Sequence, residues 1–359
     1  MSSIVGETGV RHMRRASIFD QFLAEVRAQV DSRLAWWLEA RVTQARARGT
    51  EISAVADAVR QLVLRGGKRM RATLLAAAYE GCQGEGGIQA VAPALASLEL
   101  LQAYLLAHDD WMDGDEVRRG GPSVPAMMRA HFGKKQADAA SVLAGDLAAG
   151  WALQSMLELA LAPARIIAAV RELGRVEEEV VHGQILDVCA GALDVHDVEK
   201  VYALKTASYT VRSPIVIGAV LAGADETQVA ALAAFAGPLG IAFQLRDDML
   251  GMFGDAHAMG KPLGGDLREG KRTALVIDAM RDPGAAELLS HVLGRADASA
   301  EEIAAAIASL ETSGARARIE QRIKTLVSES RAALDGANLT VYGLTLLTQA
   351  VVVLTERDR

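Results

Sequence analysis

Cysteine, asparagine and aromatic residues are scarce in this chain of 359 residues. Cys82 and Cys189 lie far apart and lack the spacing of a metal-binding motif, so we interpret them as reduced core thiols of a cytosolic protein. Asn338 is the only asparagine in the sequence, and aromatic residues make up 4% of it. Hydrophobic residues nevertheless reach 51%, much of it Ala, Leu and Val, and this composition favours helices over strands.

The chain also lacks an excess of positive charge and a long apolar run. Its formal net charge of −7 argues against a nucleic-acid partner, because a general nucleic-acid binder shows a basic footprint. The longest apolar runs, near residues 214–224 and 230–245, are short or are interrupted by Gly, Pro and Gln, so we predict no membrane span. The basic N-terminal residues precede no apolar core, which excludes a secretory signal. We therefore expect a soluble, cytoplasmic protein.

The hydrophobic pattern predicts a single all-α domain. Apolar residues recur at intervals of three and four from Ile18 to Arg46 and in most later segments, and no run alternates as a strand would. We assign this domain to residues 17–359, after a disordered segment at residues 1–16. Helices are predicted at 18–46, 52–64, 91–109, 123–132, 136–160, 164–189, 195–210, 212–223, 226–251, 272–281, 284–295, 300–311 and 314–334.

An acidic cluster ends one of the most apolar of these helices. Asp109 and Asp113 are four residues apart and share a helix face, while Asp110 points about 100° away. Buried carboxylates need compensation, and oxygen-rich clusters with an open side suit Mg²⁺. Arg118 and Arg119 follow closely, and their forked guanidinium groups match phosphate oxygens. This combination predicts a metal–phosphate site.

A second acidic helix and several basic residues extend this prediction. Gln244, Asp247, Asp248 and Gly251 fall on one face of the helix predicted at 226–251. A single lysine or arginine is usually just solvated, so the signal is their joint occurrence with the acidic helices. The basic and polar residues concerned are Lys68 and Arg71 after a Gly-Gly break, Lys205 with Thr206, and Lys261 and Lys271 on either side of a glycine-rich loop.

Together these motifs resemble the trans-isoprenyl diphosphate synthase (polyprenyl synthetase) family. The matching segments occur in the family order and span about residues 60–275. They are Gly66-Gly67-Lys68-Arg69-Met70-Arg71, Asp109-Asp110-Trp111-Met112-Asp113 with Arg118-Arg119-Gly120, His182-Gly183-Gln184 with Asp187, Lys205-Thr206, Phe243-Gln244-Leu245-Arg246-Asp247-Asp248, Gly260-Lys261-Pro262 and Asp266-Leu267-Arg268-Glu269-Gly270-Lys271.

The resemblance implies antiparallel helices around a deep cavity, a homodimer, and head-to-tail condensation of an allylic diphosphate with isopentenyl diphosphate. It implies about three Mg²⁺ ions around the bound diphosphate, held by Asp109, Asp113 and Asp247, with Lys205 and Arg118 completing the catalytic set. The implied allylic diphosphate ligands are Arg118, Lys205, Thr206, Gln244, Lys261 and Lys271. The implied isopentenyl diphosphate ligands are Lys68, Arg71, Gln102 and Arg119.

Two positions depart from the family pattern. Gly251 stands where the second acidic motif usually ends in Asp, and Gln102 stands where many members carry His. Asp247 keeps the metal-ligand position and Gln102 can still donate to a phosphate, so we expect activity to survive both changes. Asp255 could assist through water.

Product length is expected to depend on Tyr104. Tyr104 lies five residues before Asp109, with Leu105 beside it, and helical geometry places Tyr104 below the metal site on the cavity wall. It could equally be a core tyrosine, and both roles are compatible. In the resembling family an aromatic residue there stops elongation, so a short product is expected. The first acidic motif lacks the two-residue insertion of typical bacterial farnesyl-type members, which favours geranylgeranyl diphosphate, with farnesyl diphosphate next and longer polyprenyl diphosphates also open.

Two other functions are compatible with parts of the pattern. A terpene cyclase would carry an Asn/Ser/Glu metal triad on a second helix, whereas this chain has its single asparagine at Asn338 and a second Asp pair instead. A non-catalytic partner subunit would show eroded metal and phosphate residues, and Gly251 alone points that way. A plain structural helical bundle would not need lysines and arginines beside buried acids.

Overall fold

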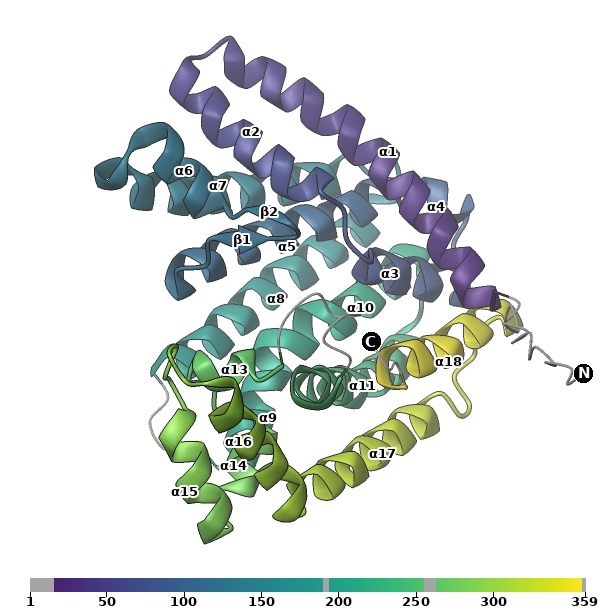
Figure 1. Ribbon diagram of the computed structural model, residues 1–359. Helices are drawn as coiled ribbons and strands as arrows, with labels where there is room; N and C mark the ends of the chain where they lie inside the picture. Colours follow the sequence, from purple (N-terminus) through teal and green to yellow (C-terminus); the bar gives the residue numbers. More distant parts are fainter. Residues whose placement is uncertain (1–15, 190–193, 255–262, 357–359) are drawn as a thin grey trace, which may run out of the picture.

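The regular structure of the described residues is helical except for one short hairpin. The computed structural model describes residues 16–189, 194–254 and 263–356, and Figure 1 shows their helices arranged around a central group. The all-α prediction is therefore confirmed. Of the segment predicted to be disordered, residues 1–15 lie outside the described residues. The single-domain organisation of residues 17–359 remains a prediction.

The first half of the chain forms the upper part of the molecule in Figure 1. Many helices begin at residues that cap free backbone N–H groups, and Ser17, for example, forms a capping box at the start of α1. The helices are α1 (Ile18–Arg46), α2 (Thr50–Leu64), α3 (Met70–Gly81), α4 (Gly87–Ala90), α5 (Ala92–Asp113), α6 (Val124–Phe132), α7 (Lys134–Leu157) and α8 (Pro163–Cys189).

The second half forms the centre and the lower part. Asp194 and Asp225 build capping boxes at the starts of α9 and α11. The elements are α9 (Val195–Val201), the π-helix η1 (Tyr202–Arg212), α10 (Ser213–Ala222), α11 (Glu226–Phe253), α13 (Gly265–Arg268), α14 (Ala274–Ala279), α15 (Pro283–Val292), α16 (Ala300–Thr312), α17 (Ala315–Ala333) and α18 (Val341–Thr355).

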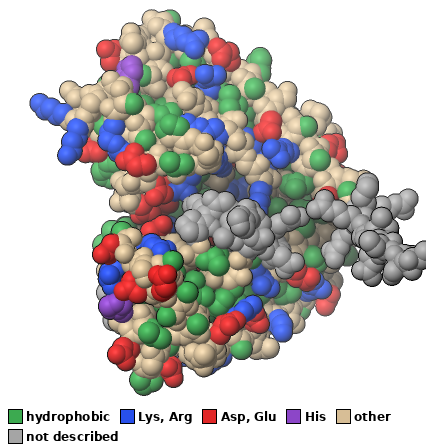
Figure 2. Space-filling model, viewed as in Figure 1, with side chains coloured by type: hydrophobic (Ala, Val, Ile, Leu, Met, Phe, Trp, Pro, Cys, Tyr) green, Lys and Arg blue, Asp and Glu red, His purple; other side chains and the backbone are tan. Residues whose placement is uncertain are grey.

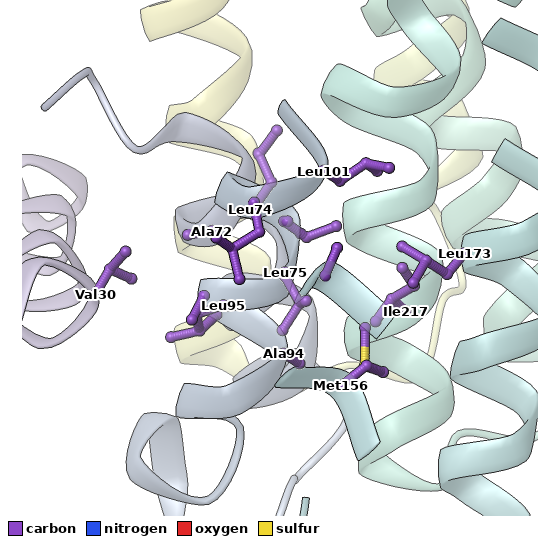
Figure 3. Close-up of a cluster of buried hydrophobic side chains, with 14 of the residues drawn as sticks. Val30, Ala72, Leu74, Leu75, Ala94, Leu95, Leu101, Met156, Leu173 and Ile217 are labelled. Atoms are coloured by element: carbon purple, nitrogen blue, oxygen red, sulfur yellow. The ribbon is translucent and has the colours of Figure 1, made fainter. Parts of the chain in front are cut away.

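Two clusters of buried side chains hold these helices together. The larger joins α1, α2, α3, α5, α7, α8, α10 and α18, and Figure 3 shows part of it, with Leu74 and Leu75 of α3 close to Leu101 of α5. The smaller joins α9, α14, α15, α16 and α17 to the second half of α11. Helix α11 contributes to both clusters, so its two halves are fixed by different parts of the core.

The acidic helix α5 is longer than the sequence predicts. It runs to Asp113 instead of ending near residue 109, and Gly114 ends it with a left-handed φ of 73°. Asp109 and Asp113 therefore lie in the last turns of one continuous helix. This confirms that the two carboxylates share a helix face.

A short hairpin follows α5, although the sequence predicts no strand. Val117–Arg118 (β1) pairs antiparallel with Gly121–Pro122 (β2), and Arg119 and Gly120 between them have φ of 52° and 70°. Two consecutive positive φ values are typical of a tight type I′ turn. Two-residue strands are too short to produce an alternating pattern, which is why the sequence does not reveal them.

The segment after α9 also differs from the prediction of two helices at 195–210 and 212–223. The chain continues without a break from α9 through η1 into α10. Helix α18 was not predicted at all, because its many Val and Thr residues have low helix propensity. Packing of α18 against α1, α3 and α11 overrides that preference.

Among the described residues, only α11 is long and apolar enough to cross a membrane on length and composition alone. The sequence-based expectation that no segment reaches this length is therefore wrong for α11. Its apolar positions pack into both core clusters. Its last turns carry the polar residues Gln244, Asp247 and Asp248.

Candidate active site

Carboxylates from four helices, together with two lysines, line one cavity of about 370 Å³, which we call the acidic cavity. The carboxylates come from α5, α8, α11 and α13, and one lysine comes from η1. Figure 2 shows acidic and basic side chains gathered where the molecule is hollowed between its upper and lower parts. The charged residues of the acidic cavity are Arg71, Asp109, Asp187, Lys205, Asp247, Asp248, Asp266, Lys271 and Arg272.

Lys205 lies between the carboxylates of this cavity. Its Nζ is 3.4 Å from Oδ1 of Asp109 and 2.6 Å from Oδ2 of Asp187. Burial disfavours the charged amine, but Asp109 and Asp187 outweigh burial and raise the pKa of Lys205. Lys205 is therefore a fixed positive charge in the acidic cavity.

The charges around Lys205 also affect the pKa of Asp113. Burial and the neighbouring Asp109 raise the pKa of Asp113, while Lys271 and Lys205 oppose that rise. Lys271 Nζ lies 2.7 Å from Glu269 and 3.9 Å from Asp266, and these acids raise the pKa of Lys271 against burial. Acids and lysines from separate sequence motifs therefore shift one another's pKa values.

Asp110 has a different role from Asp109. It is fully buried, and its Oδ1 accepts a hydrogen bond of 2.6 Å from Nε of Arg118. Burial raises the pKa of Asp110 to about 6 although Arg118 opposes the rise. Arg118 also contacts Asp115 at 2.6 Å, and it is not among the described residues that line the acidic cavity. Its predicted contact with the allylic diphosphate remains a prediction.

Asp248 is likewise engaged within the protein. Tyr202 donates its hydroxyl proton to Oδ2 of Asp248, and Gln244 donates to Oδ1 at 2.8 Å. Tyr202 also accepts the backbone N–H of Ala274 at 3.0 Å, which ties η1 to α14. Burial raises the pKa of Asp248 to about 8. Gln244 lines the acidic cavity as predicted, but its amide is directed to Asp248.

The structure supplies a carboxylate beside the glycine that breaks the second acidic motif. A Cβ added at Gly251 would lie 3.2 Å from Oδ2 of Asp266, and the N–H of Gly264 donates to the Gly251 carbonyl at 3.0 Å. Gly264 and Asp266 therefore lie beside Gly251, where the family motif usually ends in Asp. Asp266 is a site residue that the sequence did not single out, while Asp255 and Lys261 lie outside the described residues.

The four predicted isopentenyl diphosphate ligands line a second cavity of about 690 Å³, which we call the basic cavity. These are Lys68, Arg71, Gln102 and Arg119. Burial lowers the pKa of Arg119, and the neighbouring cations Arg69 and Arg71 add to this against the opposing effect of Glu99. Crowded cations in a buried setting favour an anionic ligand. The end of α18 forms another wall, which the sequence did not predict.

Arg71 joins the two cavities. It lines both of them, donates a hydrogen bond of 2.9 Å to Oγ1 of Thr210, and holds its guanidinium carbon 4.2 Å from the ring centre of Tyr209. The arginine is therefore oriented by η1 as well as by its own helix, α3. Its Nε is buried without a partner in the described structure, so a hydrogen-bond donor remains available at this wall.

Arg69 anchors the segment from Lys68 to Arg71 through its buried side chain. Its side chain is almost fully buried, and Nη1 lies 2.6 Å from Oε2 of the equally buried Glu99 of α5. Further contacts reach Asp31 of α1 at 2.8 Å and the carbonyl of Val63 in α2 at 3.0 Å. Arg69 adopts a left-handed φ of 51°, which costs a non-glycine residue roughly 1 kcal/mol or more. These contacts fix the backbone between Lys68 and Arg71.

An apolar cavity of about 300 Å³ opens on the other side of the acidic cavity. Tyr104 and Leu105 of α5 line it together with Val180 and Ile185 of α8, and Asp109 and Lys205 line both this cavity and the acidic one. The ring of Tyr104 packs edge-on against His108, with centroids 4.9 Å apart. Tyr104 thus lines the wall of a cavity that Asp109 also lines, and its effect on product length remains a prediction.

The donor set suits magnesium only in combination with another ligand. Within the described ranges, no group of three His, Cys, Asp or Glu side chains is close enough together to hold a metal ion by itself. Asp109 and Asp247 instead face one cavity from α5 and α11. Mg²⁺ is usually bound by one or two carboxylates together with substrate phosphates. These carboxylates therefore fit Mg²⁺ bound jointly with a phosphorylated ligand.

Comparison with known proteins gives a consistent result. The model of the polyprenyl synthetase family matches residues 52–310. The short chain isoprenyl diphosphate synthase of Methanocaldococcus jannaschii is 32% identical over 270 residues, covering 72% of this chain and 76% of that protein. The geranylgeranyl diphosphate synthase of Methanosarcina mazei is 31% identical over 285 residues, covering 77% of this chain and 82% of that protein.

A solved structure shares the fold over nearly the whole chain. The crystal structure of geranylgeranyl pyrophosphate synthase from Corynebacterium glutamicum, complexed with isoprenyl diphosphate and magnesium, has a TM-score of 0.85 and 33% sequence identity. The match covers 94% of this chain and 99% of that chain. The similarity therefore extends beyond the region that the family model matches.

Removing Glu99 should strongly destabilise the protein. The substitution Glu99→Ala leaves the guanidinium of Arg69 buried without its main counter-charge, which should lower the free energy of unfolding by about 3–5 kcal/mol. Asp31→Ala removes the partly exposed partner of the same arginine and should cost about 1 kcal/mol or less. Urea unfolding followed by circular dichroism measures both values, and equal losses would contradict this account.

Proposed function

The chain belongs to the polyprenyl synthetase family, and on this premise we propose that it condenses an allylic diphosphate with isopentenyl diphosphate to make geranylgeranyl diphosphate. It is a prenyltransferase. One observation carries the proposal for its substrates: an acidic cavity adjoins a basic cavity through Arg71 and an apolar cavity through Asp109 and Lys205. Two diphosphates and a hydrocarbon tail need these three environments side by side.

In this proposal the carboxylates Asp109, Asp113 and Asp247 hold about three Mg²⁺ ions together with the allylic diphosphate. When bound, Mg²⁺ supplies positive charge that stabilises the departing pyrophosphate. Lys205, Thr206, Gln244 and Lys271 line the same cavity and bind the diphosphate directly, with Arg118 and Lys261 as further proposed ligands. Lys68, Arg71, Gln102 and Arg119 bind isopentenyl diphosphate in the basic cavity.

The reaction proceeds by cleavage of the allylic C–O bond, with the electron pair leaving on pyrophosphate. Lys205 and Arg71 stabilise the growing negative charge, and the apolar side chains around Tyr104 and Leu105 keep water from the allylic cation. The double bond of isopentenyl diphosphate then attacks the cation to form a C–C bond. The proton lost afterwards goes to the pyrophosphate, since neither a histidine nor a neutral lysine lines the acidic cavity among the described residues.

The other functions considered fit the structure less well. A non-catalytic partner subunit does not require the basic ligands and acidic residues that line adjoining cavities here, and Asp266 stands beside Gly251. A farnesyl or a longer polyprenyl diphosphate remains an alternative product. The size of the apolar cavity, about 300 Å³, and the ring of Tyr104 in its wall support a product of limited length.

We further propose that the protein acts as a cytoplasmic homodimer through α7 and α8. Exposed apolar residues follow one face of each helix, namely Leu143, Leu153 and Leu157 of α7 and Ile167, Val181, Ile185 and Val188 of α8. Arg171 and Glu178 are exposed on the same face of α8, on either side of Gly174. A two-fold axis near Gly174 would place Arg171 of one copy opposite Glu178 of the other. Cys82 is buried, as expected of a core thiol, whereas Cys189 is exposed, so its predicted core position is wrong.

Incubation with isopentenyl diphosphate, each allylic primer and Mg²⁺ should give prenyl products that mass spectrometry can identify. EDTA should abolish their formation. Asp109→Asn should lower kcat by about 100-fold or more, because this carboxylate lies at the meeting point of two cavities. Asp297→Asn, at a side chain that is 83% exposed, serves as the matched control and should retain activity. Absence of any product from the unmodified protein would overturn the enzymatic proposal.

Tyr104→Ala should lengthen the product, since removal of the ring opens the wall of the apolar cavity below Asp109. Tyr104→Phe keeps the ring and should retain the original product length. Chromatography of the dephosphorylated products measures the distribution for both variants. If Tyr104→Ala gives the same chain length as the unmodified protein, Tyr104 does not limit elongation.

Ile167→Glu should convert the proposed dimer to a monomer. A charge buried at an apolar interface is unfavourable, and Ile167 does not line the described cavities. Ile52→Glu alters a similarly exposed isoleucine on α2 and should leave the assembly unchanged. Analytical ultracentrifugation distinguishes the two outcomes, and a dimer that persists in Ile167→Glu would exclude this interface.

A further inference from the structure

The π-helix η1 carries the polar side chains of the site. Lys205, Thr206, Tyr209 and Thr210 all line the acidic cavity. In an α-helix, residues 205 and 210 would point about 140° apart. A π-helix has more residues per turn than an α-helix, so residues five apart lie closer to one face, and such turns are frequent at functional sites. The π conformation therefore lets one segment present all four side chains to one cavity.

Two glycines from different helices touch the backbone of this segment. A Cβ added at Gly183 of α8 would lie 2.5 Å from the N atom and 2.8 Å from the Cα atom of Lys205. A Cβ added at Gly240 of α11 would lie 2.4 Å from Cβ and 2.7 Å from Cα of Ala207. Heavy atoms do not approach so closely, so neither position has room for a side chain. The backbone from Lys205 to Ala207 is held between α8 and α11.

Backbone conformation does not explain these glycines. Neither has a positive φ, and both are buried in the interior of a helix, where glycine is less favourable than alanine by about 1 kcal/mol. Gly237, one turn before Gly240 in α11, has open space at its Cβ position. Space alone therefore distinguishes Gly183 and Gly240, because only there would an alanine push η1 away.

The position of η1 determines where the charge of Lys205 lies. Its Nζ contacts Asp109 and Asp187 at 3.4 and 2.6 Å, and Arg71 is oriented by Tyr209 and Thr210 of the same segment. A shift of η1 would move all these groups together. A misplacement of about 1 Å can lower a rate by roughly 100-fold even when the altered residue does not touch the reacting atoms.

We propose that Gly183 and Gly240 are positioning residues. The space that they leave for the backbone of η1, which we call the notch, sets the position of Lys205 and Thr206 relative to Asp109. The kinetic test of this proposal rests on the proposed prenyl transfer. A second test measures diphosphate binding and does not depend on that reaction. The notch acts through η1 and not through contact with the substrate. A side chain added at either glycine should displace η1, and removal of the side chain that fills the notch should loosen η1, so both changes should disturb the site.

The test compares alanine variants that differ in steric overlap and location. Gly183→Ala and Gly240→Ala should each lower kcat by about 10- to 100-fold and weaken binding of inorganic pyrophosphate with Mg²⁺ by about tenfold. The KM for isopentenyl diphosphate should rise less than pyrophosphate binding weakens, because η1 orients Arg71 but Lys68 and Gln102 of the basic cavity lie outside η1. Steady-state kinetics and titration calorimetry give these values.

Two control variants separate positioning from general destabilisation. Gly237→Ala, with open space on the same helix, should stay within about twofold of the unmodified protein. Gly343→Ala creates an equally severe overlap, since its Cβ would lie 2.1 Å from Cα of Gly81, but at the far end of α3 from Arg71. It should lower the thermal unfolding temperature without lowering the kcat of the folded enzyme. An equal loss of kcat in Gly343→Ala would overturn the proposal.

A second pair of variants applies if the overfilled proteins do not fold. Ala207→Gly empties the Gly240 side of the notch, whereas Ala203→Gly removes the same methyl group from η1 where it does not meet Gly240. Ala207→Gly should lower kcat and pyrophosphate affinity more than Ala203→Gly, and equal effects would overturn the proposal. If the unmodified protein binds pyrophosphate but forms no prenyl product, the proposed function fails and the pyrophosphate affinities alone decide the role of the notch.

Discussion

Repulsion between carboxylates is the constraint on which this site depends. Asp109, Asp187, Asp247 and Asp266 line one cavity, and bringing them together is unfavourable unless positive charge accompanies them. Lys205 supplies that charge at distances of 2.6–3.4 Å, and Lys271 supplies it beside Asp266. The same lysines are proposed ligands of a diphosphate. A bound diphosphate would therefore compete for lysines whose contacts with carboxylates stabilise the cavity in the unliganded protein.

The residues that support these groups are more deeply buried than the groups themselves. Asp110 holds Arg118, Asp248 holds Tyr202 and Gln244, and Glu99 holds Arg69. The contacts Asp110–Arg118, Asp248–Tyr202 and Glu99–Arg69 each join a helix to another segment of the chain, so the polar residues at the cavity surface are held in place by buried neighbours. This arrangement explains how adjoining acidic and basic cavities coexist on a scaffold that is otherwise built from Ala, Leu and Val.

Close packing between helices is a further requirement of the site. Helix α11 belongs to both core clusters, and Gly240 lets it lie against η1 where the acidic cavity begins. Gly145 similarly leaves space for the ring of His108, since a Cβ there would lie 2.3 Å from that ring. His108 packs against Tyr104, so the wall of the apolar cavity also depends on a small residue of a neighbouring helix.

The sequence by itself determined the helical class, most helix positions and the members of each charged motif, because helical spacing and local charge are properties of short segments. Through resemblance to a family it grouped Asp109, Asp113, Asp247 and Lys205 in one site. The structure brings Asp109, Asp247 and Lys205 to the acidic cavity, Asp113 is not among the described residues that line it, and the roles of all four remain predictions. Only the tertiary structure decided that Arg118 is engaged by Asp110, that Gln244 faces Asp248, and that Asp266 stands beside Gly251. These residues are close in sequence, but which partner each side chain takes depends on the orientation and burial that tertiary packing imposes. The π conformation of η1 and the helix α18 also depend on such packing, which no local pattern in the sequence contains.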